Sequence, residues 1–279
     1  MKKPIYTCLW FNNNAKEAVE IYSKSFQGLK IANETPMVIN FEFEGQKVMC
    51  LNGGPMYRPN PSISLFVVFS TENEIQRAWD YISEGGSVLM PLNKYEWSQK
   101  YGWLNDKFGV SWQFFLGNKD DFGQKLIPNI LFTGSNAGKA REAINHYIKI
   151  FENSSVVAMN EYKAGDNDVE GYLKHARFKL RNSQFIIMDS SLTHHFGFSE
   201  GNSFVIECEN QEEIDFFWNK LTEDGEEGQC GWLKDKYGIS WQVVPAILSE
   251  LMSDDEKAER VVAAFLKMKK FEIDKLLSA

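Results

Sequence analysis

Thirteen residues near the middle of the chain return almost unchanged near its end, and this repeat constrains the fold more than any other feature. Residues 101–113 and 230–242 share nine identities at an offset of 129, with the pattern Gly-Trp-Leu-x-Asp-Lys-(Phe/Tyr)-Gly-x-Ser-Trp-Gln. Residues 65–86 align with 204–225, and residues 18–26 with 143–151, in the same order. An ordered repeat of this kind indicates a duplicated domain.

The duplication also predicts the domain boundaries. We expect one domain over residues 1–120, a second over residues 125–247, and a C-terminal helical extension over residues 248–279. The offset falls from 139 to 129 between the two longer matches, so the second half lacks ten residues that correspond to 87 through about 97. One strand or hairpin of the first half is therefore expected to be absent or shortened in the second.

Composition narrows the class of partner. The 279 residues carry a net charge of −8 and a pI near 5.2, which disfavours nucleic acid because phosphate binding needs a basic surface. The densest basic stretch, Lys267, Lys269 and Lys270, is flanked by acids and is interpreted as a solvated helix face. The sequence shows neither a membrane-spanning run nor a signal peptide, and its four cysteines form no CxxC pair, so we expect a cytoplasmic protein.

Hydrophobic periodicity assigns the secondary structure. Residues 5–11 read as a strand, residues 15–26 as an amphipathic helix, and residues 37–43 and 47–51 as strands of a hairpin. The pattern then restarts at residue 62, so each half predicts a βαβββ module used twice, an α+β fold with mixed sheets. A capping box at residues 253–256 predicts a final helix that runs to about Leu277.

This arrangement resembles the vicinal oxygen chelate superfamily of glyoxalases, bleomycin-resistance proteins and extradiol dioxygenases, and most closely its PhnB-like branch, often labelled as a demethylubiquinone methyltransferase. The resemblance is carried by Leu9-Trp-Phe11 with the helix after it, by Asn52-Gly-Gly-Pro55, and by the repeated motif. It implies that paired modules curl into cups, each with a divalent metal at its base. The matching ligand positions are Thr7, Ser64, Gln113, Pro128 or Asn129, Ser203 and Gln242.

None of these positions is His, Asp, Glu or Cys, which are the side chains that give divalent ions useful affinity. We therefore expect no metal and no cofactor. A methyltransferase would need a site for its methyl donor, yet Gly53-Gly54 is followed by a proline and Gly85-Gly86 ends a predicted helix. Methyl transfer is accordingly disfavoured.

The last strand of each half suggests what lines the cup instead. Ser111, Gln113 and Phe115 share one face of the strand, and Trp112 shares the other with apolar residues, so we expect Trp112 to pack beneath the helices. A purely structural role, with Gln113 bridging neighbouring strands and Trp103 in the core, is the alternative. The predicted ligand-binding set is Thr7, Leu9, Ser64, Trp103, Ser111, Gln113, Ser203, Trp232, Ser240 and Gln242.

These expectations favour metal-independent binding of a small aromatic or apolar organic ligand. The rivals are an enzyme, either metal-dependent or using Asp189 with His194 or His195 as an acid/base pair, and a scaffold without a ligand. His194 and His195 are adjacent and point to opposite sides of an extended chain, so a polar loop is the competing interpretation. Because related single-domain proteins pair across a dimer interface, we expect the tandem chain to be a monomer or a weak homodimer.

Overall fold

Two compact units make up the chain in the computed structural model, which describes residues 3–253 and 255–279. The larger unit covers residues 6–202, and the smaller unit combines residues 1–5 with residues 203–279. The domain boundaries expected from the repeat, 1–120 and 125–247, stay a prediction. Each unit is described by itself.

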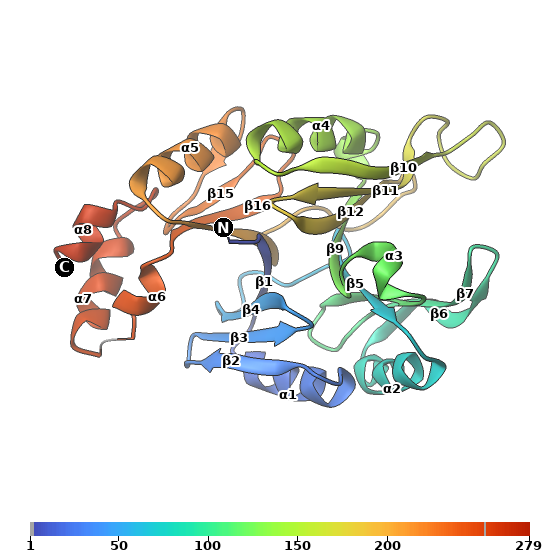
Figure 1. Ribbon diagram of the computed structural model, residues 1–279, viewed down its shortest axis with the longest axis horizontal. Helices are drawn as coiled ribbons and strands as arrows, with labels where there is room; N and C mark the ends of the chain where they lie inside the picture. The colour runs from blue at the N-terminus through green and yellow to red at the C-terminus, as the bar shows by residue number, and fades with distance from the viewer. Residues whose placement is uncertain (1–2, 254) are drawn as a thin grey trace. The chain divides into compact units, whose positions relative to one another are not determined.

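Eight strands of the larger unit form one mixed sheet, in the order β10-β11-β12-β9-β5-β8-β7-β6 (Figure 1). The strands are β5 (Ile63–Phe69), β6 (Ser87–Tyr95), β7 (Ser98–Asn105), β8 (Ser111–Leu116), β9 (Leu126–Phe132), β10 (Ser155–Glu161), β11 (Leu173–Leu180) and β12 (Ser183–Asp189). β5 pairs parallel with β8, and β12 pairs parallel with β9. The mixed sheet and the α+β class predicted from the sequence are confirmed.

The two halves of the repeat meet in this sheet at β5 and β9. These strands run antiparallel, with Ser64 opposite Asn129 and Phe66 opposite Ile127. β5 to β8 come from the first half and β9 to β12 from the second. A single chain therefore completes an eight-stranded sheet from two four-stranded modules, which is the intramolecular pairing expected of a tandem repeat.

Four further strands of the larger unit pair in the order β1-β4-β3-β2. They are β1 (Tyr6–Phe11), β2 (Lys30–Glu34), β3 (Val38–Phe43) and β4 (Gln46–Asn52), and the helices of the unit are α1 (Ala15–Ser25), α2 (Glu72–Ser83), α3 (Lys119–Phe122), a 3-10 turn η1 (Gly134–Asn136) and α4 (Ala140–Ile150). α1 buries Ala15, Ala18, Val19 and Tyr22, the face that its periodicity predicts.

One core packs under α1 and α2. It joins Leu9 and Phe11 of β1 to Leu65 and Val67 of β5 and to Trp112 of β8. We call this the helix-side core. Trp112 is 1% exposed and its ring lies 5.0 Å from that of Tyr22, so its predicted position beneath the helices is confirmed.

A buried aspartate explains why the repeated motif is so well preserved between the halves. The Asp106 carboxylate accepts hydrogen bonds from the backbone N–H groups of Phe108 and Val110, both at 2.9 Å, from Trp112 Nε1 at 3.0 Å and from Tyr22 Oη at 2.7 Å. Burial raises the pKa of this carboxyl, and the four donors oppose that rise. One side chain thus fixes a turn, a core tryptophan and a helix.

The smaller unit repeats the device at Asp235, which accepts from Tyr237 N at 2.9 Å, Ile239 N at 3.1 Å and Trp241 Nε1 at 2.8 Å. Its strands pair in the order β14-β15-β16-β13. The elements of this part of the chain are β13 (Asn202–Cys208), α5 (Gln211–Thr222), β14 (Glu226–Glu227), β15 (Trp232–Lys234), β16 (Ser240–Pro245), α6 (Leu248–Leu251), α7 (Asp255–Phe265) and α8 (Ile273–Leu277).

The ten-residue deficit falls on the hairpin formed by β14 and β15. β14 has two residues where β6 has nine, and β15 has three where β7 has eight. The shortened hairpin predicted for the second half is confirmed. Its longer counterpart carries Tyr95 and Trp97, whose rings stack 5.6 Å apart.

The C-terminal extension differs from the single long helix that was predicted. It forms α6, α7 and α8, and the chain between α7 and α8 is not helical. The carbonyl groups of Met268 and Lys269 accept hydrogen bonds from Cys230 N at 2.8 Å and Gly231 N at 2.7 Å, so they are not available to continue a helix. Asp254 of the proposed capping box lies outside the described residues. Among the described helices, none is long and apolar enough to cross a membrane.

Candidate functional site

The face of the β5–β12 sheet opposite the helix-side core carries a second apolar cluster, and we call this the inner face. Its buried members are Phe66, Val68, Tyr101, Ile127 and Ile186. Partly buried side chains pack against them, and these are Met90, Tyr95, Trp103, Phe115, Phe122 and Met188. The inner face is therefore built by both halves of the repeat and is rich in aromatic side chains.

A hydrogen-bonded chain of polar groups crosses the first-half strands of this face. Tyr101 Oη donates to Gln113 Oε1 at 2.8 Å, and Gln113 Nε2 donates to Ser64 Oγ at 2.8 Å. Trp103 Nε1 donates to Ser111 Oγ, also at 2.8 Å. Burial raises the pKa of Tyr101 far above its ordinary value, with a smaller contribution from Tyr95, so the phenol stays protonated and remains a donor. Four members of the predicted ligand-binding set, Ser64, Trp103, Ser111 and Gln113, thus lie on one face, and their role in binding stays a prediction.

Asn129 continues this polar row across the boundary between the halves. It lies opposite Ser64 on β5 and is paired in register with Ile186 on β12. Its side chain is 3% exposed, and Nδ2 approaches Met188 Sδ at 3.6 Å. Asn129 Oδ1 is buried without a hydrogen-bond partner, which is a costly arrangement for a polar atom. The sequence left Pro128 and Asn129 as alternatives, and strand alternation places Asn129 on the inner face.

Two basic residues of the inner face were missed by sequence reasoning. His175 and Arg177 lie on β11, where Arg177 is paired in register with the inner-face residue Ile186. Desolvation by burial, aided by the charge of Arg177, lowers the pKa of His175 to about 4, so its imidazole is neutral near pH 7. His175 and Arg177 alternate in the sequence with the apolar residues Ala176 and Phe178, which are fully buried. This alternation could have placed both basic residues on one face of β11.

Helix α3, which follows β8, is held against the inner face. The Phe122 ring lies 5.5 Å from that of Phe66 and 5.3 Å from that of Phe115. The guanidinium of Arg177 lies 5.0 Å from the Phe122 ring centroid, and Arg177 Nη1 donates to the Asp121 carbonyl. An aromatic ring thus already packs against this surface.

Thr7 and Leu9 are corrections to the predicted ligand-binding set. Leu9 is fully buried in the helix-side core with Phe11, and Thr7 shares their face of β1 because side chains two positions apart point the same way. Cys8 and Trp10 take the opposite face. Thr7 also belongs to the β1-β4-β3-β2 strands, so it does not join Ser64 and Gln113.

The predicted residues of the second half form a matching arrangement in the smaller unit. Gln242 Nε2 donates to Ser203 Oγ at 2.9 Å, the counterpart of the bond between Gln113 and Ser64. Trp232 is paired with Gln242 between β15 and β16 and is partly exposed, and Ser240 is 1% exposed with no hydrogen-bond partner at Oγ.

Asp189 has structural partners. Its Oδ1 accepts from Gly138 N at 2.8 Å and Ala140 N at 3.2 Å at the start of α4, and its Oδ2 accepts from Leu173 N at 3.0 Å. Three backbone donors thus hold both oxygens of the carboxylate. His194 Nε2 instead lies 3.1 Å from Ser190 Oγ. The arrangement favours an anchoring role for Asp189 over an acid/base pair with His194 or His195.

The residues at the predicted metal positions do not fit a divalent ion. Ser64, Gln113 and Asn129 supply only neutral oxygen and amide groups, and both ends of the Gln113 amide already bond to Tyr101 and Ser64. Divalent ions need carboxylate or imidazole ligands to offset their dehydration. Within residues 3–253 and 255–279, no group of three or more His, Cys, Asp or Glu is placed to hold a metal ion.

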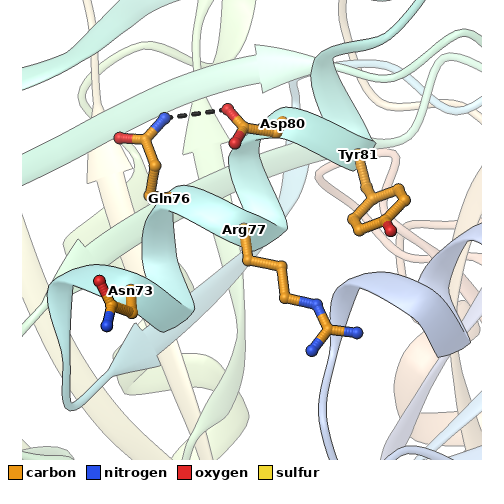
Figure 2. Close-up of a pocket in the computed structure, with 5 residues that line it drawn as sticks. All are labelled: Asn73, Gln76, Arg77, Asp80 and Tyr81. Carbon is orange, nitrogen blue, oxygen red and sulfur yellow. Dashed lines mark hydrogen bonds between the residues drawn. The ribbon is translucent and has the colours of Figure 1, made fainter.

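Two open hollows lie away from the inner face. One, of about 430 Å³, is lined by polar residues along the solvent side of α2 (Figure 2). There Gln76 Nε2 donates to Asp80 at 2.9 Å, and Arg77 donates to the Lys24 carbonyl at 2.9 Å. The other, of about 540 Å³, lies beside the turn between α7 and α8 and is lined largely by lysines. Both are surface depressions with side chains already engaged in local bonds.

Comparison with known proteins matches this geometry to one family. The family model described as 3-demethylubiquinone-9 3-methyltransferase matches residues 3–115 and again residues 124–244. The PhnB protein from Bacillus cereus is 34% identical over 40% of this chain and 98% of its own, with a TM-score of 0.38. Glyoxalase I from Zea mays is 11% identical, covers 91% of this chain and 96% of its own, and has a TM-score of 0.62, which supports the fold alone. No protein of curated function matches the chain.

Proposed function

We propose a function for a chain that belongs to the 3-demethylubiquinone-9 3-methyltransferase family, in the PhnB-like branch of the vicinal oxygen chelate superfamily. The chain binds a small organic ligand without a metal, on the inner face of the β5–β12 sheet. One observation carries the proposal: Ser64, Gln113 and Asn129 occupy the positions where metal-coordinating side chains are expected, and they lie within an aromatic surface. Small-molecule sites combine aromatic walls with a few placed polar groups.

Methyl transfer is not the function that these residues support. In this fold Gly85 and Gly86 follow α2 instead of preceding a helix, and Gly53 packs against the Trp10 ring. A helix N-terminus next to a glycine turn is what binds the anionic part of a nucleotide-like cofactor. The family description therefore does not transfer to this chain as an activity.

An acid/base enzyme is the second candidate, and His175 is the imidazole of the inner face that such an enzyme would use. A general base works best when its pKa lies near the working pH, whereas the pKa of His175 is about 4. Neutral His175 is better suited to accept or donate a hydrogen bond than to take a proton from a substrate. Binding therefore ranks first.

The first experiment asks whether a metal is bound. Elemental analysis of the purified protein should find no stoichiometric transition metal, a chelator should leave the melting temperature unchanged, and added nickel, zinc or manganese should not raise it. A stoichiometric metal held by Gln113 or Gln242 would overturn the proposal and move the enzyme candidate ahead of the binder.

The second experiment locates the ligand. Small molecules that co-purify with the protein are identified by mass spectrometry from the native chain and from Trp103→Ala and Trp232→Ala, two variants at equivalent positions of the repeat. Loss of a ligand in Trp103→Ala alone supports the inner face. Equal retention in both variants, or loss in Trp232→Ala alone, contradicts it.

A further inference from the structure

The unpartnered Asn129 carbonyl lies in apolar surroundings on the inner face. Ile186 is its neighbour on β12, Met188 Sδ lies 3.6 Å from its amide nitrogen, and Ile127 precedes it by two positions on the same face of β9. Its other cross-strand neighbour, Ser64, already accepts a hydrogen bond from Gln113. A buried acceptor in a low-dielectric setting gains more from a donor than an exposed one does.

The charges around the acceptor limit what can satisfy it. The buried polar side chains of this face that were named above, Ser64, Ser111, Gln113 and Asn129, are all neutral. The charged side chain named on this face, Arg177, donates to the Asp121 carbonyl and lies over the Phe122 ring, so its guanidinium is already engaged. A cationic ligand would therefore be desolvated without a counter-charge, and an anionic ligand would meet a carbonyl oxygen instead of a donor. A neutral N–H or O–H group satisfies the oxygen without either cost.

The aromatic neighbours limit the shape of the ligand. Phe66 lies two positions from Ser64 on the same face, and its ring is 5.6 Å from that of Phe115. Phe122 packs against both. Rings stacked or tilted at these separations are typical of favourable aromatic contacts, so the surface suits a planar ring.

We propose that the inner face binds a neutral planar aromatic molecule, of the phenol or N–H heteroaromatic class, whose donor bonds to Asn129 Oδ1. This deepens the proposed function and rests on it. The second half of the repeat then supplies the group that selects the ligand, while the first half supplies the aromatic wall.

Matched probe pairs test the proposal. Phenol and anisole differ by the donor, and so do indole and 1-methylindole. Each is titrated into the full chain by NMR, and the amide shifts of β5 and β9 locate the binding. We expect the donor-bearing member of each pair to bind about fivefold more tightly, the typical net worth of one hydrogen bond.

Two leucine variants provide the control. Asn129→Leu should abolish the preference without lowering thermal stability, because it removes a buried unpaired carbonyl. Asn40→Leu, which replaces another buried asparagine with an unpartnered Oδ1 on β3, should keep the preference.

The possible failures are distinguishable. Equal binding of both members of each pair to the native chain, or a preference that survives in Asn129→Leu, overturns the assignment of Asn129 and leaves the proposed function standing. If none of the four probes shifts the amides of β5 or β9, both the inference and the proposed binding site are wrong.

Discussion

Lowering the pH should weaken the fold through one residue, His175. Burial and the charge of Arg177 depress its pKa from 6.5 to about 4 in the folded chain. Between these two values the unfolded chain binds a proton and the folded chain does not, so the free energy of unfolding falls as the pH falls. The stabilising contribution of neutral His175 is fully present above pH 6.5 and is lost below about pH 4.

The gap between the two pKa values sets the size of the effect. Each pH unit is worth about 1.4 kcal/mol, so the gap from 6.5 to about 4 corresponds to roughly 3 kcal/mol. A variant with Gln at position 175 has no proton to bind. The free energy of unfolding of the native chain minus that of His175→Gln should therefore decrease by roughly 3 kcal/mol between pH 7.5 and pH 4.

Urea unfolding of both proteins at half-unit pH intervals measures this difference. Carboxyl groups whose pKa burial raises, such as Asp106 and Asp189, contribute equally to both proteins and cancel. The imidazole signals of His175 give an independent reading and should not move between pH 8 and pH 5. A difference that is independent of pH, or an imidazole that titrates near 6.5, would refute the desolvated, neutral state of His175.

Three other substitutions test how the fold is held together. Asp106→Asn should lower the free energy of unfolding by about 1–3 kcal/mol, because its amide nitrogen would face the Trp112 Nε1 donor, and unchanged urea stability would contradict that role. Gly102→Ala would place a Cβ 2.4 Å from the Trp79 ring and should cost about 1–3 kcal/mol, seen as a lower melting temperature. Thr71→Ala removes the capping-box bond of α2 that Thr71 Oγ1 accepts from Glu74 N and should cost about 1 kcal/mol in the same assay, while an unchanged melting temperature would argue against the cap.

The sequence shows which side chains share a face of a strand only when one face is polar and the other is apolar. When both faces are apolar, the alternation gives no such information. In β8 the contrast between Gln113 and Trp112 gave the correct faces. β1 is apolar on both faces, so its pattern contains no such contrast, and a displacement of one residue exchanged the face of Thr7 with that of Cys8. The same error was avoided for β9 only because the sequence left both Pro128 and Asn129 as candidates.

The pairing of strands that are far apart in the sequence was the second limit on what could be predicted. The junction of β5 with β9 brings Ser64 beside Asn129, and this contact joins residues from different halves of the repeat. Local patterns predict strands but carry little information about which strands become neighbours. The break between α7 and α8 has the same origin, because Cys230 and Gly231 take the carbonyl groups of Met268 and Lys269 from another part of the sequence.

The duplication itself separates residues that maintain the fold from residues that can carry function. Asp106 and Asp235 hold equivalent turns, so this aspartate is needed wherever the module folds. The bond of Gln113 to Ser64 also recurs, as that of Gln242 to Ser203, so this bond alone does not distinguish the two halves. A residue that has no counterpart in the other half of the repeat is not explained by the needs of the shared fold.

The features that are not repeated gather on the inner face. Tyr101 is replaced by Cys230 at the equivalent position, and the hairpin that carries Tyr95 and Trp97 is cut to β14 and β15 in the second half. Trp97 remains 57% exposed while its ring lies 4.5 Å from that of Tyr101, which bonds to Gln113. The unrepeated hairpin thus contacts the polar row of the inner face directly, and that is why a search for the proposed ligand belongs on the β5–β12 sheet.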